Sequence, residues 1–333
     1  MSNLTPTQIG SGHEGNLRDQ VKAYFSRVKN GEMGALPAFG ALVVLAILFG
    51  SLSPYFFTTL NIANLFVQAA ELTTLAAALV FVILLAEIDL SAGVAAGVAM
   101  DIFYLCLKAN IPWQAGVIVA LLFGLVLGWF VAKIGVPSFV VTLAFFLAFQ
   151  GVALILIGDG GLFRVEVPEI KAIMNENLPA AVGWGLLVAG VLISLAIGLW
   201  DRARRSKLGL AVRPLSILLT KTAVIAVIGG VIVFFLNQNR SAAFKPIEGV
   251  PIVIPIVVAL LAIGTFVLDR TRFGRHLYAV GGNPEAARRA GIKVGMIRIS
   301  AFVICSMLAV ISGLFHVSRI GVVEAAAGRS IVL

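Results

Sequence analysis

Long apolar runs, repeated along most of the chain, are the feature that most constrains its fold. About nine of them reach or approach the roughly 20 residues that an α-helix needs to cross the hydrocarbon of a bilayer. Membrane barrels instead show alternating strands of about ten residues. We therefore predict an all-α, polytopic transmembrane helical bundle. Its predicted spans are about 37–53, 62–86, 91–107, 113–132, 138–157, 181–200, 215–236, 250–268 and 299–317.

Composition supports an integral membrane protein. Of 333 residues, 60% are hydrophobic and 12% are charged, whereas about a quarter of the residues in a soluble domain are charged. The net charge of +9 raises the question of a nucleic-acid partner. The basic residues, however, lie in short segments between apolar runs, where the positive-inside rule accounts for them. We expect membrane lipid around the chain and no nucleic acid.

The distribution of lysine and arginine predicts the orientation. With the N-terminus cytoplasmic, the cytoplasmic segments hold 18 of the 25 Lys and Arg residues. The other side holds the remaining seven, which are Lys108, Arg164, Lys171, Arg240, Lys245, Arg319 and Arg329. This asymmetry favours an N-in topology. It also places the exposed loops 158–180 and 237–249 outside.

The chain divides into a polar N-terminal segment, 1–36, and a membrane domain, 37–333. Within the first segment, apolar residues recur at helical spacing among basic ones, including Leu17, Val21 and Val28. We expect a cytoplasmic amphipathic helix there. It lies either on an anionic membrane surface or against the protein's own loops.

The polar interval 270–298 carries the end signals of a short helix. Asn283 is a typical N-cap, Pro284 suits the first helical position, and Gly291 follows the end. About two turns of helix are marginal in water unless they pack on something. We therefore expect a cytoplasmic partner for this helix. The alternative is a helix that packs on its own loop.

The sequence contains none of the common motifs of catalytic sites. It has no GxxxxGK[ST] phosphate loop, HExxH, CxxC or GxSxG. The histidines His13, His276 and His316 are scattered, and Cys106 and Cys305 lie in apolar segments as small buried hydrophobes. We expect no catalytic residue, no metal and no cofactor on this chain.

Polar groups inside predicted spans are the candidates for a pathway, because charge in a bilayer is costly. Glu71, Asp101 and Gln150 are such groups, as is His316. A proton-coupled secondary carrier needs carboxylates of this kind. Hydrogen bonding between helices is the alternative use of the same residues, and we favour it.

The second and third spans are joined by a very short segment. Asp89 and Ser91 are placed to cap the third span. The pairs Gly93–Gly97 and Gly124–Gly128 have the GxxxG spacing that lets helices approach closely, and we expect internal packing from them.

Two motifs resemble the membrane permeases of bacterial ABC monosaccharide importers of the ribose and xylose type. The cytoplasmic signature comprises Gly274, Arg275, Gly281, Gly282, Asn283, Pro284, Glu285, Ala286, Ala287, Arg288 and Gly291. The hallmark between early spans comprises Ile88, Asp89, Leu90, Ser91 and Gly93. The resemblance runs from about residue 37 onward and is stronger for the xylose type, because a basic segment begins near Arg202.

The resemblance implies a non-enzymatic permease subunit in the bacterial inner membrane. Its expected partners are separate ATPase subunits that bind ATP and Mg, an extracytoplasmic sugar-binding protein and a second permease copy. The segment Asn283–Gly291 would be the helix that couples to the ATPase. Gln150 replaces an arginine usual in the family, and relatives continue with further spans beyond Leu333. A truncated, non-transporting fragment is therefore a further alternative.

Overall fold

The computed structural model describes residues 36–112, 114–158, 162–210, 214–241 and 246–324, together with the single residues 26, 28, 34 and 212. The chain separates into two compact units, the first of residues 1–62 and 178–250 and the second of residues 63–177 and 251–333. The amphipathic helix predicted within 1–36 lies outside these ranges apart from Ser26 and Val28, both helical.

The first unit contains α2 (Leu36–Leu52), α8 (Ala180–Lys207) and α9 (Leu215–Leu236). The helices α8 and α9 form an antiparallel hairpin, in which Gly198 lies against Leu218 and Gly229 against Leu187. After α9, Arg240 is buried because its guanidinium donates to the carbonyl oxygens of Leu236 and Gly249. The amide of Gly249 also donates to the carbonyl of Leu236, so the arginine and this amide together hold residues 240–249 against the end of α9.

The second unit contains most of α3 and all the remaining long helices. Its helices are α3 (Thr59–Ile83), α4 (Ala92–Lys108), α5 (Gln114–Trp129) with the π-helix η2 (Phe130–Ile134), α6 (Ser138–Ile157), α7 (Pro168–Asn175), α10 (Val253–Arg270), α11 (Arg272–Gly282), α12 (Pro284–Arg289) and α13 (Val294–Ile320). Strands β1 (Leu162–Arg164) and β4 (Val322–Glu324) also belong to this unit. Strands β2 (Asn177–Leu178) and β3 (Val250–Pro251) each contain one residue of either unit.

Each of the nine predicted spans falls on a helix, and this confirms the all-α polytopic bundle. Among the described residues, six helices are long and apolar enough to cross a membrane: α3, α6, α8, α9, α10 and α13. The other three segments form α2, α4 and α5, which are shorter.

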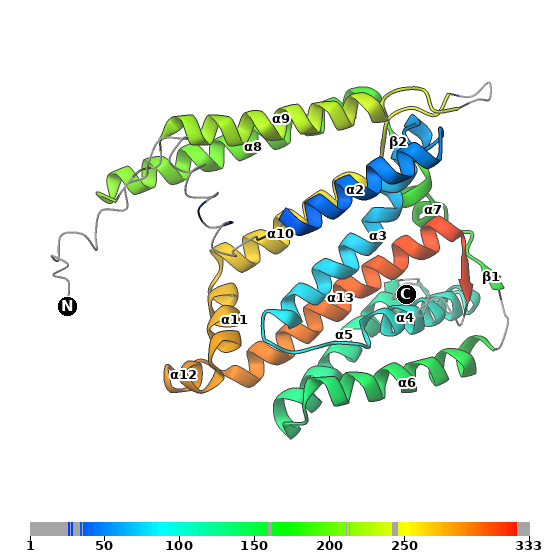
Figure 1. Cartoon of the computed structure of the whole chain (residues 1–333). Coiled ribbons are helices and arrows are strands. Elements are labelled where there is room, and N and C mark those ends of the chain that lie inside the picture. The colour runs from blue at the N-terminus through cyan, green and yellow to red at the C-terminus, as the bar shows by residue number, and fades with distance from the viewer. Residues whose placement is uncertain are drawn as a thin grey trace. The chain divides into compact units, whose positions relative to one another are not determined.

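Helix α13 is the centre of the second unit (Figure 1). Its buried residues Phe302, Cys305 and Ala309 share one apolar cluster with residues of α3, α4, α5 and α6. A Cβ on Gly124 would lie 2.5 Å from the Cα of Val303, and one on Gly128 would lie 2.8 Å from the Cα of Ile299. The second GxxxG pair therefore brings α5 onto the backbone of α13, as predicted for internal packing.

The segment 158–180, predicted to be a loop, contains two short strands and a helix. Strand β1 pairs antiparallel with β4, with Phe163 opposite Val323. Helix α7 begins at Pro168 and buries Ile170 and Met174. Both elements hold the end of α13. Strand β4 follows α13 directly, and the amide of Met174 in α7 donates to the hydroxyl of Ser318 in α13.

Candidate functional site

The polar interval 270–298 contains two helices, α11 and α12, whereas its end signals predict one. Helix α10 runs on to Arg270, and α11 follows at a sharp turn (Figure 1). Thr271 caps α11, since its hydroxyl accepts a hydrogen bond of 3.2 Å from the amide of Gly274. The buried residues Leu277 and Val280 pack with Phe81 and Leu85 from the end of α3. The spacing of Phe273, Leu277 and Val280 was the signal that could have revealed this amphipathic helix.

Helix α12 begins at the predicted residue and has the predicted N-cap. The side-chain oxygen of Asn283 accepts a 2.9 Å hydrogen bond from the amide of Ala286, and Pro284 is the first helical residue. Gly291 has φ +84°, and the amide of Ile292 donates to the carbonyl of Ala287. This left-handed residue ends the helix, which stops at Arg289, one residue before the predicted end.

Ala287 is the buried residue of α12, and the other side chains of this helix, apart from the half-buried Pro284, are exposed. Ala287 is 4% exposed and lies in the cluster formed by α3, α11 and α13. The side chains of Arg288 and Glu285 are 62% and 68% exposed and form an ion pair of 2.6 Å. An exposed pair of this kind adds little stability. The helix thus packs partly on its own unit and keeps a charged outer face.

Glycine lets α11 lie directly on the end of α3. A Cβ on Gly281 would overlap the carbonyl oxygen of Leu84, whereas one on Gly282 would meet no atom within 4 Å. At the start of α13, Arg298 forms an ion pair of 3.0 Å with Glu87. These contacts tie α11, α12 and α13 to the segment that follows α3.

Removal of the Asn283 cap is expected to loosen α12. The substitution Asn283→Ala leaves the amide of Ala286 without its acceptor and should cost about 1 kcal/mol, a large effect for a helix of six residues. Amide hydrogen exchange across residues 284–289 should become about fivefold faster at that cost. Asn283→Ser restores a capping oxygen and should keep exchange near the wild-type rate. Equal exchange in all three proteins would contradict the capping role.

The hallmark segment 87–91 is held by hydrogen bonds to helices α6 and α13. The amide of Ile88 donates to the hydroxyl of Ser138, and the hydroxyl of Thr142 donates to the carbonyl of Ile88, both at 3.1 Å. The Asp89 carboxylate accepts from the amide and hydroxyl of Ser91, and the thiol of Cys305 donates to it at 3.7 Å. Burial raises the pKa of the Asp89 carboxyl, and the hydrogen bonds from Ser91 oppose that shift.

The predicted capping by this segment is only partly confirmed. Asp89 accepts the free amide of Ser91, as a cap should. Ser91 stands at the N-cap position of α4, but its side chain makes no capping bond. The prediction was wrong for Ser91 because its hydroxyl donates to Asp89 instead. Ile88 and Leu90 are exposed, and Gly93 is buried in α4.

The three candidate pathway residues lie on different helices. Glu71 belongs to α3, Asp101 to α4 and Gln150 to α6. Within the described ranges, no recorded hydrogen bond or ion pair joins any two of them. Asp101 is 1% exposed, and neither of its carboxylate oxygens has a hydrogen-bond partner among the described residues. Gln150 is half-buried.

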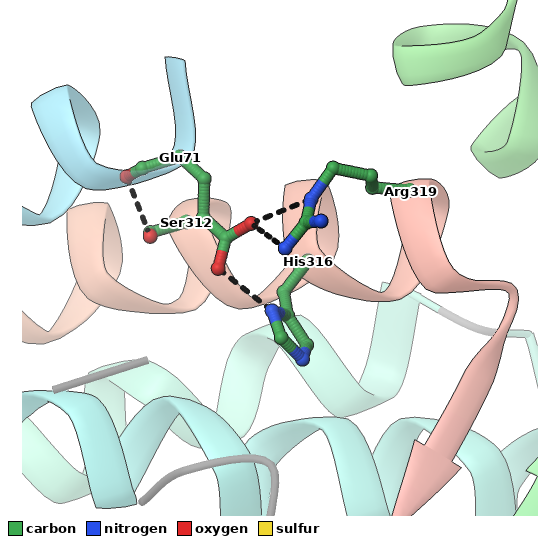
Figure 2. Close-up of polar contacts among 4 residues, drawn as sticks. All are labelled: Glu71, Ser312, His316 and Arg319. Atoms are coloured by element: carbon green, nitrogen blue, oxygen red, sulfur yellow. Dashed lines mark hydrogen bonds and ion pairs between the residues drawn. The ribbon is translucent and has the colours of Figure 1, made fainter. Parts of the chain in front are cut away.

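Glu71 is paired with α13, and this pairing was not predicted. Figure 2 shows its carboxylate between His316 and Arg319. One oxygen lies 2.7 Å from Nδ1 of His316, and the other lies 3.1 Å from Nη2 of Arg319. The hydroxyl of Ser312 donates to the backbone carbonyl of Glu71 at 2.9 Å. Glu71 thus forms hydrogen bonds between two helices, which is the use that the sequence favours for these polar residues.

Comparison with known proteins identifies the family. The family model described as "Branched-chain amino acid transport system / permease component" matches residues 61–217 and 217–332. The chain belongs to this family of membrane permeases. No solved structure gives a significant match.

The relatives narrow the type of permease. The chain is 34% identical to the xylose transport system permease protein XylH of Escherichia coli over 99% of its own length and 81% of that protein. It is 27% identical to the ribose import permease protein RbsC of the same organism, over 86% of its own length and 70% of that protein. The chain is thus a multi-pass plasma-membrane permease subunit of the ABC importer type, and a proton-coupled carrier belongs to a different class.

Proposed function

We propose that two copies of this chain form the inward pathway of an importer for xylose or a related monosaccharide. Separate ATPase subunits bind ATP and Mg on the cytoplasmic side, and an extracytoplasmic protein delivers the sugar. This chain itself binds no cofactor. The identity with the xylose permease, 34% against 27% for the ribose permease, supports the choice of xylose. The family resemblance of the two motifs supports the set of partners.

The observation that carries the proposal is the construction of α12. A helix of six residues with a single buried side chain is only marginally stable by itself. Its N-cap and its left-handed C-terminal glycine nevertheless fix its ends, and this favours a role for its exposed face in binding. That face carries Arg288, Glu285 and Arg289, all exposed, and arginine is enriched at the centre of protein interfaces. We therefore assign α12 and the flanking glycines to ATPase binding.

The geometry also supplies a way to pass motion into the membrane. Helix α12 is joined to α13 through residues 290–293 and shares an apolar cluster with α3 and α11. Packed clusters of this kind shift as units and do not deform continuously. A displacement of α12 by its ATPase would therefore move α13 and the end of α3, and with them the walls of the pathway.

Transport in cells tests the choice of sugar. We expect radiolabelled D-xylose to enter a host that lacks its own xylose permease when this chain is expressed with its ATPase and sugar-binding protein. Excess unlabelled ribose should compete less than excess unlabelled xylose. Uptake of ribose in preference to xylose would contradict the sugar assignment and leave the permease class intact.

A further inference from the structure

The polar contacts of Glu71 connect two helices that are also connected at their other ends. Glu71 is 4% exposed, so its charge needs partners within the protein. All of its recorded side-chain partners lie on α13: Nδ1 of His316 at 2.7 Å, and Nε and Nη2 of Arg319 at 3.2 and 3.1 Å. Ser312 adds a bond to the Glu71 backbone. We call Glu71, Ser312, His316 and Arg319 the Glu71 cluster (Figure 2).

The Glu71 cluster lies far from α12 along a single helix. Helix α13 is continuous from Val294 to Ile320. At 1.5 Å per residue, His316 is about 33 Å from the start of the helix. At the near end, Arg298 binds Glu87, and Gly281 of α11 lies on Leu84. Helices α3 and α13 are therefore joined near α12 and joined again at the Glu71 cluster.

The same distal part of α13 holds the segment 162–175. The amide of Met174 donates to the hydroxyl of Ser318 at 3.1 Å, and the side-chain amide of Asn175 donates to the Ser318 carbonyl at 2.6 Å. Beyond the helix, β4 pairs with β1, and the amide of Val165 donates to Gly321. A shift of the distal end of α13 must therefore carry β1 and α7 with it.

We propose that Glu71 is a positioning residue that makes α3 and α13 move as one body, so that a displacement of α12 reaches α7 and β1 at the other end. This inference rests on the proposed function. Without the Glu71 cluster, the distal end of α13 keeps its bonds to α7 but loses its polar link to α3. The apolar contacts between α3 and α13 remain, but the distal end of α13 can then slide relative to α3, and less of the displacement of α12 reaches α7 and β1.

The test measures coupling in proteoliposomes that contain the permease, its ATPase and its sugar-binding protein loaded with D-xylose. ATP hydrolysis is measured with and without the loaded binding protein and is divided by the amount of assembled complex. We expect Glu71→Gln to lower the stimulation about tenfold, within the usual range of coupling between sites, while hydrolysis without the binding protein persists. The control Glu248→Gln removes an exposed carboxylate that lies outside α3, α7, α13 and β1 and should behave as the wild type.

A double substitution tests whether the cluster acts as a unit. If Glu71 and Arg319 work through each other, Glu71→Gln combined with Arg319→Gln should lower stimulation no further than either change alone. Independent losses that multiply would overturn the inference. So would wild-type stimulation per complex in Glu71→Gln accompanied only by a lower unfolding temperature, because that result marks a purely structural residue.

A milder variant covers the case in which Glu71→Gln does not assemble. Ser312→Ala removes one bond to α3 and leaves the charges in place, and we expect a twofold to fivefold loss of stimulation. Wild-type stimulation in Ser312→Ala would then overturn the inference. If the wild-type permease itself shows no stimulation by the loaded binding protein, the proposed function fails, and this outcome is distinct from failure of the variants alone.

Discussion

Reversing the charge of Arg288 is expected to release the permease from its ATPase. Arg288 is 62% exposed and pairs only with the neighbouring Glu285 among the described residues, so Arg288→Glu leaves the buried contacts of α12 intact. The like charges three residues apart should cost the helix only about 0.5 kcal/mol. Loss of a hot-spot arginine costs about 2 kcal/mol or more, which weakens binding at least about 30-fold.

Co-purification measures this release. The ATPase should elute with the tagged wild-type permease and be lost from Arg288→Glu at equal permease yield. Lys207→Glu is a matched control, because Lys207 is an exposed basic residue at the end of α8. Deletion of residues 284–290 should have the same effect as Arg288→Glu. Retention of the ATPase by both α12 variants would contradict the assignment of α12.

A side chain at Gly281 is expected to separate α11 from the end of α3. The site has no room for a Cβ, because the carbonyl oxygen of Leu84 occupies that position. Gly281→Val must therefore move one backbone segment relative to the other, and overpacking of this kind costs about 1–3 kcal/mol. The unfolding temperature in detergent should fall by several degrees, and ATP-driven transport should be lost because α12 no longer moves with α3.

The next residue provides the control for that experiment. Gly282 lies at the end of α11, and a Cβ there meets nothing within 4 Å. Gly282→Val should therefore leave the unfolding temperature within about a degree of the wild-type value, as is usual for surface substitutions of small free-energy effect. If the two valine variants unfold at the same temperature, close packing of α11 on α3 is not what Gly281 provides.

Local signals and distant contacts differ in how well the sequence predicts them. Helix α12 was predicted nearly to the residue because Asn283, Pro284 and Gly291 act on the backbone beside them. Helix α11 was not predicted because arginines and a histidine separate its apolar residues in the sequence. These apolar residues lie on one face, and that face is buried only because it packs against the end of α3. The apolar runs predicted every long helix, since each has to satisfy its own backbone in lipid.

Pairings across the fold could not be predicted in this way. Glu71 was recognised as a costly buried acid, but its partners His316 and Arg319 lie more than 240 residues later. No periodicity within α3 or α13 specifies that the two helices meet at this level. The same holds for Asp89 and Cys305, which come together only when α13 packs beside the hallmark segment.

The energy source of transport distinguishes an ATP-driven permease from a proton-coupled carrier most directly. Proteoliposomes that contain the permease and its ATPase are loaded with ATP and Mg, and the sugar-binding protein with radiolabelled D-xylose is supplied outside. We expect xylose to accumulate only when ATP is present and the ATPase is included, and a protonophore should leave the rate unchanged. Accumulation without ATP that collapses when the protonophore is added would contradict an ATP-driven permease.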